Sequence, residues 1–186
     1  MAEAGELSLD ELFERLARMP VPDGYKVEVV EGTAHVSPQR EVHREIVGRI
    51  VQVLESRYGP GVHVKSDERI DFPGDGNGFA PDVAKIADEA KMDDQGRWSY
   101  EDVEFVAEVT SESSAGNDYG PKRIAYALAG VPVYVIVDPY AGRCHAFSQV
   151  QGGEYRSEHT VLFGTPLDLT GTAIDLVLPT VGFPQD

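Results

Sequence analysis

Asp82, Glu108 and Lys122 are charged residues in segments that otherwise read as core. Asp82 begins the apolar stretch DVAKI, and Glu108 lies inside FVAEV. A carboxylate in a buried strand is costly unless it is paired or binds a metal. If the two strands are neighbours, both carboxylates meet at one edge of a sheet, and a divalent cation would remove their mutual repulsion.

Such a pair of acids suits phosphodiester hydrolysis. Magnesium binds few protein carboxylates and keeps several waters. A cation of this kind polarises a phosphoryl oxygen and lowers the pKa of a bound water. Lys122 would orient the attacking water or stabilise developing negative charge. The three residues therefore predict a metal site, of a kind that suits phosphodiester hydrolysis.

Spacing supports the position of the lysine but leaves alternatives open. Asp118, Lys122 and Tyr126 follow each other at intervals of four, so they share one face of a helix. If that face meets the sheet, Lys122 points at the carboxylates. On spacing alone, Asp118 and Lys122 could equally form a surface ion pair. Glu108 could also face solvent on an edge strand, and Asp82 could be a turn residue beside a proline.

The elements that position these residues follow from hydrophobic periodicity and turn signals. Helices are predicted over 8–19, with Ser8 and Glu11 as a capping box, over 41–58, and over 122–129, starting near 117–118 with Pro121 in the first turn. Strands are predicted over 25–30 and 34–36 as a hairpin, and over 62–72, 80–86, 105–109, 133–137, 143–148 and 155–160. Residues 73–78 read as a loop and 88–102 as a mobile excursion. This order indicates an α/β (α+β) fold with a mixed central sheet, in which 105–109 and 133–137 are parallel.

Composition narrows the class of protein. A chain of 186 residues fits one domain, 1–186. The N-terminus lacks the features of a signal peptide, and no apolar run reaches about 18 residues, so a cytoplasmic protein without a membrane span is expected. The single cysteine, Cys144, excludes an intrachain disulfide and is expected to pack in the core. The net charge of −16 opposes nucleic-acid binding unless metal ions or a few Lys and Arg residues offset it.

Several segments together resemble a known family. They read SLDELFERLARMP, YKVEVVEGTAHVSP, HREIVGRIVQVL, APDVAKI, EFVAEVTSES and DYGPKRIAYALAGVPVYVIVDP. They look like the Uma-two family of restriction-endonuclease-like proteins, a branch of the PD-(D/E)XK nuclease superfamily, over residues 7–180. The resemblance implies a restriction-endonuclease-like core, with a mixed sheet flanked by helices. It also implies an endonuclease that acts on DNA with Mg²⁺ or Mn²⁺.

The resemblance also assigns residues. It implies that Asp82 and Glu108 bind the metal and that Glu28, in YKVEVVEG, joins them. In the wider superfamily a lysine stands two residues after the second acid, where this chain has Thr110. The family supplies the lysine from the following helix, which implies Lys122. His43 stands where the family often has histidine, which allows a hydrogen bond in the site, although a lone histidine at a helix start is more often a capping or surface group.

Two functions from different classes remain open at this point. One is the metal-dependent endonuclease, favoured by Asp82, Glu108 and Lys122. The other is a catalytically degenerate nuclease-fold protein that serves as an interaction or regulatory module, favoured by Thr110 and the negative charge. A homodimer is also considered, because nucleases that cut two strands are commonly homodimers and the predicted hairpins could pair.

Overall fold

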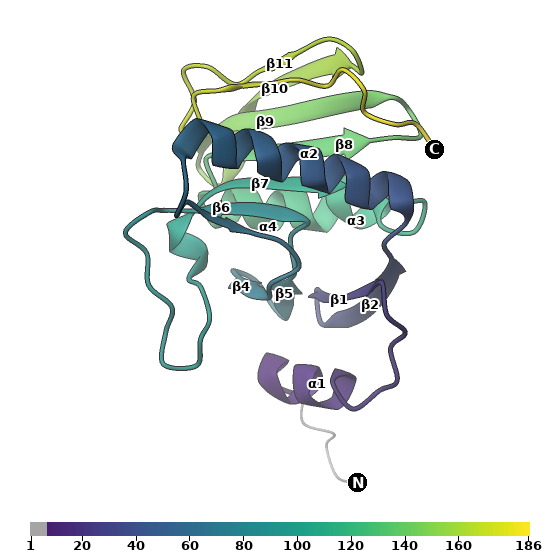
Figure 1. Ribbon diagram of the computed structural model, residues 1–186. Coiled ribbons are helices and arrows are strands. Elements are labelled where there is room, and N and C mark those ends of the chain that lie inside the picture. The colour runs from purple at the N-terminus through teal and green to yellow at the C-terminus, as the bar shows by residue number, and fades with distance from the viewer. Residues whose placement is uncertain (1–6) are drawn as a thin grey trace, which may run out of the picture.

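A six-stranded mixed sheet forms the centre of the protein, as seen in a computed structural model that describes residues 7–186 (Figure 1). The strand order is β10-β9-β8-β7-β6-β3, and only β7 and β8 are parallel. The strands are β3 (His63–Lys65), β6 (Val83–Ile86), β7 (Val103–Val109), β8 (Val133–Asp138), β9 (Arg143–Gln151) and β10 (Glu154–Leu162). Residues 1–6, part of the N-terminus used above to argue against a signal peptide, lie outside the described residues.

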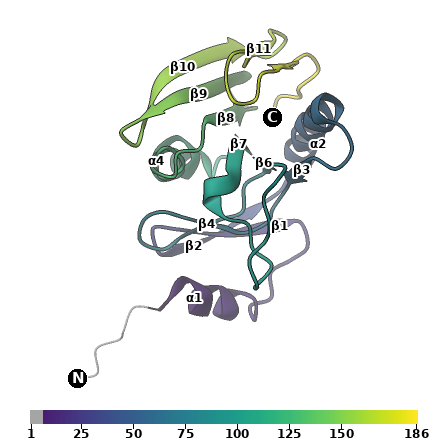
Figure 2. The same ribbon diagram turned by 90° about the vertical axis from the view of Figure 1, so that its left-hand side faces the viewer.

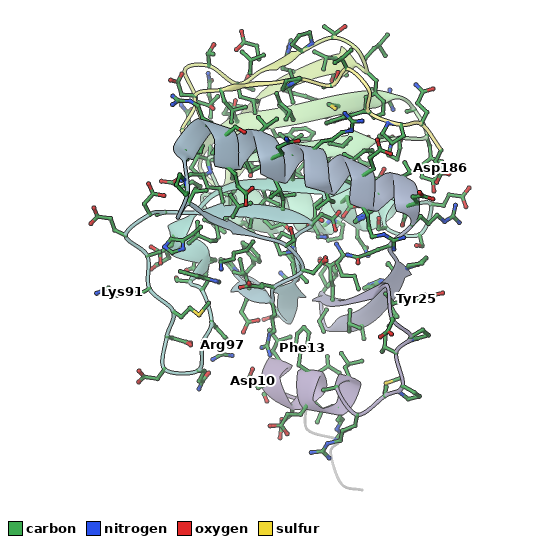
Figure 3. All side chains as sticks on the ribbon, viewed as in Figure 1. Asp10, Phe13, Tyr25, Lys91, Arg97 and Asp186 are labelled. Atoms are coloured by element: carbon green, nitrogen blue, oxygen red, sulfur yellow. The ribbon has the colours of Figure 1, made fainter. Side chains whose placement is uncertain are left out.

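A smaller antiparallel sheet packs against one face of the main sheet. Its order is β2-β1-β5-β4, formed by β1 (Tyr25–Val30), β2 (Thr33–Pro38), β4 (Ile70–Phe72) and β5 (Asn77–Phe79). Helix α1 (Leu9–Leu16) lies on its outer side (Figures 1 and 2). Phe13 of α1 packs under the guanidinium of Arg69, and Asp10 Oδ1 accepts a hydrogen bond of 2.9 Å from Arg97 (Figure 3). These contacts attach α1 to the body of the protein.

Helices cover both faces of the main sheet. On one face, α2 (Glu41–Tyr58) packs with the C-terminal tail that carries β11 (Leu167–Asp168) and β12 (Val177–Leu178). The opposite face is covered by the small sheet and by α4 (Arg123–Leu128), which share one apolar cluster around Tyr126. A short helix α3 (Ala115–Asn117) and a π-helical segment (Asp118–Lys122) precede α4. A 3₁₀ turn (Tyr100–Asp102) leads into β7. Among residues 7–186, no helix is long and apolar enough to span a bilayer.

Most predicted elements are confirmed. The mixed sheet, the 25–36 hairpin, the parallel pair β7–β8 and the β9–β10 hairpin are all present. The Ser8–Glu11 capping box is present too, although α1 ends at Leu16 rather than near Met19. Cys144 is buried in the core beneath α2, as expected.

Three details of the prediction are wrong. The single strand over 62–72 is two strands, β3 and β4, which belong to different sheets. The loop over 73–78 already contains the start of β5. The helix before α4 starts at Ala115, so Pro121 lies inside it rather than in its first turn. A wide π turn, with Gly120 outside helical angles, accommodates this proline, which lacks the N–H that a helix interior needs.

Candidate active site

Asp82 and Glu108 meet on neighbouring strands. Asp82 directly precedes β6, and Glu108 lies in β7, which is an interior strand of the sheet. The Asp82 backbone N–H donates to Glu108 Oε2 at 3.3 Å, and the Val109 N–H donates to Asp82 Oδ2 at 2.7 Å. The two residues are only 2% and 1% exposed. The alternative in which Glu108 faces solvent on an edge strand is therefore wrong.

Glu28 reaches the same place from the small sheet. Alternation along β1 directs the side chains of Lys26, Glu28 and Val30 to one face, and Val30 packs in the apolar cluster shared with the main sheet. Glu28 Oε1 accepts a hydrogen bond of 2.9 Å from the Ala80 N–H, in the segment that leads to Asp82. The glutamate implied by the family resemblance thus lies in the cluster with the other two acids.

Lys122 joins the three acids from the π-helical segment. Its Nζ lies 2.6 Å from Glu108 Oε1 and 3.0 Å from Glu28 Oε1. Asp118 Oδ1 lies 3.3 Å from the same nitrogen, without good hydrogen-bond geometry. Lys122 is 1% exposed. The alternative of a surface Asp118–Lys122 pair is wrong, because the helix face that carries both residues packs against the sheets.

Lys26 is a functional-site candidate that the sequence analysis missed. Its Nζ lies 2.6 Å from Asp82 Oδ1 and 3.3 Å from Glu108 Oε2. It also lies 3.5 Å from Glu28 Oε2. The available signal was its position two residues before Glu28, which places both side chains on one face of a strand. A lysine on the inward face of a strand needs carboxylates to neutralise it.

His43 and Tyr126 complete the cluster by holding the acids. His43, in the first turn of α2, has its Nε2 2.9 Å from Asp82 Oδ2, so the alternative of a surface or capping histidine is wrong. The Tyr126 hydroxyl donates to Glu108 Oε1 at 2.6 Å. Tyr126 is fully buried between the rings of Phe72, Phe79 and Tyr134, which fixes its orientation. Both residues therefore position carboxylates.

Burial and ion pairing act against each other on the acids. Burial alone would raise the pKa of Asp82 and Glu28, but nearby lysines, and His43 for Asp82, hold both values below their ordinary range. Burial prevails at Glu108, whose pKa rises to about 7 despite Lys122 and Lys26, and burial also raises the pKa of Asp118. Pairing therefore favours the carboxylate form of Asp82 and Glu28, whereas burial favours the protonated form of Glu108 and Asp118.

The same opposition applies to the bases. Burial disfavours the ammonium groups of Lys26 and Lys122, yet the surrounding carboxylates outweigh it and raise the pKa of both. For His43 burial also opposes the charged form, and the hydrogen bond and charge of Asp82 overcome it, so that the pKa of His43 is raised. Lys26 and Lys122 are therefore held as ammonium groups among the acids.

The donor set fits a hard divalent cation by its chemistry. Carboxylate oxygens are the ligands that Mg²⁺ and Mn²⁺ take from proteins. Within residues 7–186, however, no three His, Cys, Asp or Glu side chains are already arranged around a metal position. The Lys26 ammonium stands between these carboxylates instead, as a stand-in cation. Thr110, at the place of the superfamily lysine, is buried and its Oγ1 finds no hydrogen-bond partner among the described residues.

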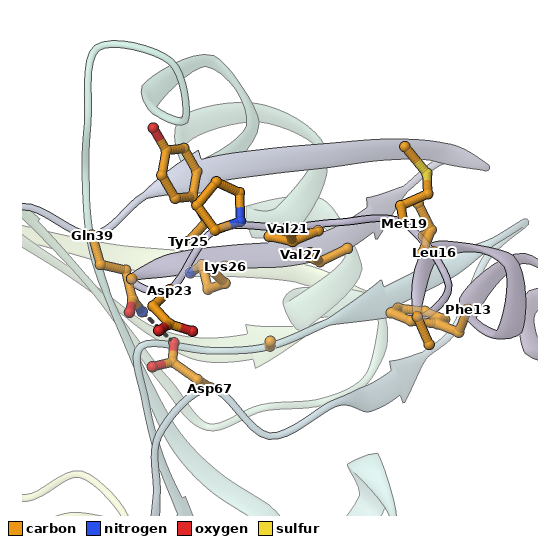
Figure 4. A pocket seen from close by; sticks show the side chains of 14 residues that line it. Phe13, Leu16, Met19, Val21, Asp23, Tyr25, Lys26, Val27, Gln39 and Asp67 are labelled. Carbon is orange, nitrogen blue, oxygen red and sulfur yellow. Dashed lines mark hydrogen bonds between the residues drawn. The ribbon is translucent and has the colours of Figure 1, made fainter.

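A cavity of about 580 Å³ lies between α1 and the small sheet and is bordered by Lys26 of the cluster (Figure 4). Lys26 and Ala80 line its inner wall, and Phe13 lines the end near α1. Near Lys26 the wall also includes Gln39 and Asp67, joined by a hydrogen bond of 2.7 Å. Lys26 is the member of the ionic cluster that borders this cavity.

Comparison with known proteins identifies the family of the chain and a solved structure with a similar fold. The family model Uma2, described as "Putative restriction endonuclease", matches residues 10–180. The chain belongs to the Uma2 family. A solved structure described as "a putative nuclease belonging to DUF820", from Anabaena variabilis, has a TM-score of 0.69 to this Uma2 chain at 15% identity, covering 94% of this chain and 95% of that one. No curated protein matches the chain. The Uma2 assignment and the shared fold support a nuclease-type function.

Proposed function

We propose that this Uma2 chain is a Mg²⁺- or Mn²⁺-dependent endonuclease that hydrolyses phosphodiester bonds in DNA. The observation that carries the proposal is the convergence of Glu28, Asp82, Glu108 and Lys122. These residues come from β1, the start of β6, β7 and the helical segment before α4, and they are buried together. Burying four charges is costly, so a fold that does this without a function is disfavoured.

The roles follow from position. Asp82, Glu108 and Glu28 would hold the cation. When bound, such a cation polarises a phosphoryl oxygen and lowers the pKa of a coordinated water. Lys122 presents an ammonium with three donors beside two of these acids, where it would stabilise charge on the phosphate oxygens or orient the water. Tyr126 and His43 fix the carboxylates of Glu108 and Asp82.

DNA as the substrate rests on the family description and on phosphodiester chemistry. With a net charge of −16, the chain would repel DNA over most of its surface, so binding should depend on the divalent cation and on a few Lys and Arg residues. The predicted homodimer stays a prediction.

A second candidate function has its own supporting observation. Lys26 and Lys122 already pair with all four acids of the cluster, so every acid has a cationic partner without a metal. A catalytically degenerate nuclease-fold protein that acts as an interaction or regulatory module would keep these ion pairs as part of its core.

One experiment separates the two functions. Mg²⁺ and Mn²⁺ are titrated by calorimetry into wild type, Asp82→Ala and the control Asp94→Ala, which alters an exposed acid in the 88–102 loop. Cleavage of supercoiled plasmid is followed in parallel. If the chain is the proposed endonuclease, wild type and Asp94→Ala should both bind metal and nick the plasmid. Asp82→Ala should do neither. Absence of metal binding from folded wild type would support the degenerate protein instead.

A further inference from the structure

Lys26 occupies a special position within the acidic cluster. Its Nζ lies within 3.5 Å of an oxygen from each of Asp82, Glu108 and Glu28. Lys122 does not share this property, because the described contacts of its ammonium are to Glu28, Glu108 and Asp118. The Lys26 nitrogen therefore marks the point from which a single cation faces all three proposed metal ligands.

An ammonium and a divalent cation cannot occupy that point together. An ammonium has three donors and no lone pair, so it cannot act as a metal ligand. Mg²⁺ needs carboxylate oxygens at about 2.0–2.1 Å, and these are the oxygens that Lys26 now binds. The two positive charges would also repel at this short distance. Binding of the metal thus requires the lysine side chain to leave.

The structure offers Lys26 a place to go. Its side chain lines the cavity of about 580 Å³ that opens to the surface, and Figure 4 shows Asp23 and Asp67 at the same end of this cavity. Both of these carboxylates are exposed. A lysine has a flexible four-carbon stem, so its ammonium can rotate outward without movement of β1. Asp67 and Asp23 would supply it with new charged partners.

Resting on the function proposed above, we propose that Lys26 is a displaceable internal counter-ion. Its ammonium holds the metal position in the metal-free protein and moves into the cavity beside Asp67 when a divalent cation binds. The exchange keeps a cation among the buried acids in both states. It also lowers the apparent affinity for metal, because the metal must compete with the lysine.

The first test is metal affinity. Lys26→Met keeps an unbranched, apolar stem one atom shorter than that of lysine and removes the charge. Lys85→Met is the matched control, since Lys85 is a buried lysine on β6 of the main sheet that pairs with Glu104 rather than with the cluster. Calorimetric titration with Mn²⁺ should show at least tenfold tighter binding to Lys26→Met than to wild type, and no change for Lys85→Met. Binding to folded Lys26→Met that is equal to or weaker than binding to wild type would overturn the inference while leaving the proposed metal site intact.

A second test uses the wild-type chain and does not depend on the folding of a variant. Reductive methylation by formaldehyde, read by mass spectrometry, reports which amines are accessible. Lys26 should be protected without metal and modified at saturating Mn²⁺, whereas exposed Lys91 is modified in both states. Protection of Lys26 at saturating Mn²⁺ would overturn the displacement. Failure of wild type and Lys26→Met alike to bind Mn²⁺ would overturn the proposed function itself, and the inference with it.

Discussion

The imidazole of His43 and the carboxylate of Asp82 are 2.9 Å apart, although one residue starts α2 and the other precedes β6. This contact satisfies Asp82 Oδ2, which also accepts the Val109 N–H, while Oδ1 accepts from Lys26. Both oxygens of the carboxylate are therefore fixed by groups from three elements. Such preorganisation is what a metal ligand or a buried structural acid requires.

The His43–Asp82 contact predicts how stability depends on pH. Burial acts to lower the pKa of His43, but the hydrogen bond and the charge of Asp82 outweigh it and raise the pKa above 6.5 in the folded protein. Folding therefore favours the imidazolium. Its stabilising contribution is complete below pH 6.5 and is lost as pH rises through the folded pKa. Urea unfolding of wild type should therefore show a steeper loss of stability above pH 6.5 than unfolding of His43→Gln. His63→Gln, which alters a histidine of β3, serves as the control, and equal slopes for all three proteins would contradict the assignment.

The single cysteine predicts a thiol that does not react in the native protein. Cys144 is fully buried on β9, and burial raises its pKa to about 12. The reactive thiolate is therefore scarce and inaccessible at pH 8. Ellman's reagent should leave the native protein unmodified over hours and release one equivalent of chromophore in 8 M urea. Rapid reaction of the folded protein would show that β9 or the tail opens readily.

Periodicity and turn signals predicted the mixed sheet and the helices because each of those elements carries its own apolar pattern. They also predicted that Asp118, Lys122 and Tyr126 share a face, and all three side chains are buried. Local patterns did not show which strands belong to which sheet. The 62–72 segment was therefore read as one strand, although β3 and β4 pair with different partners.

The candidate site was only partly predictable for a similar reason. Asp82 and Glu108 stood out as charges in apolar strands, whereas Lys26 and His43 have surroundings that look ordinary for surface residues. Their burial follows from the packing of the small sheet and α2 against the main sheet, which is a long-range property. The family resemblance supplied Glu28 but gave no reason to single out Lys26.

The Tyr126–Glu108 hydrogen bond predicts a larger stability loss than an ordinary tyrosine bond. Tyr126 donates to a carboxyl at 2.6 Å, and such charge-assisted bonds contribute about 1.5–3 kcal/mol. Tyr126→Phe keeps the packed ring and removes the donor. We expect it to lose about 2 kcal/mol at pH 8, where Glu108, with its pKa raised by burial to about 7, is largely ionised. The matched control is Tyr155→Phe, whose hydroxyl donates to the neutral Val131 carbonyl at 3.0 Å and should cost about 1 kcal/mol. Urea unfolding measures both losses, and a smaller loss for Tyr126→Phe would contradict this account.

The Lys122 ammonium predicts strong coupling to Asp118. The Lys122 ammonium lies within 3.3 Å of an oxygen of Glu28, Glu108 and Asp118, and Lys122→Met removes this shared cation. Removal of one partner from a buried network costs about 3–5 kcal/mol of stability. Asp118→Asn in the same chain removes one of the uncompensated acids. The double variant should therefore lose less stability than the sum of the single losses, by about 1–3 kcal/mol.

Equilibrium unfolding in urea at pH 7.5 measures this cycle, with Lys85→Met and Asp94→Ala providing the distant control pair. Their losses should add, because Lys85 pairs with Glu104 and Asp94 is exposed. Additive losses for Lys122→Met and Asp118→Asn would show that the two residues do not interact in solution. If Lys122 also acts on the phosphate as proposed, Lys122→Met should abolish plasmid nicking. The double variant should stay inactive even where Asp118→Asn restores stability, because the ammonium that acts on the phosphate is still missing.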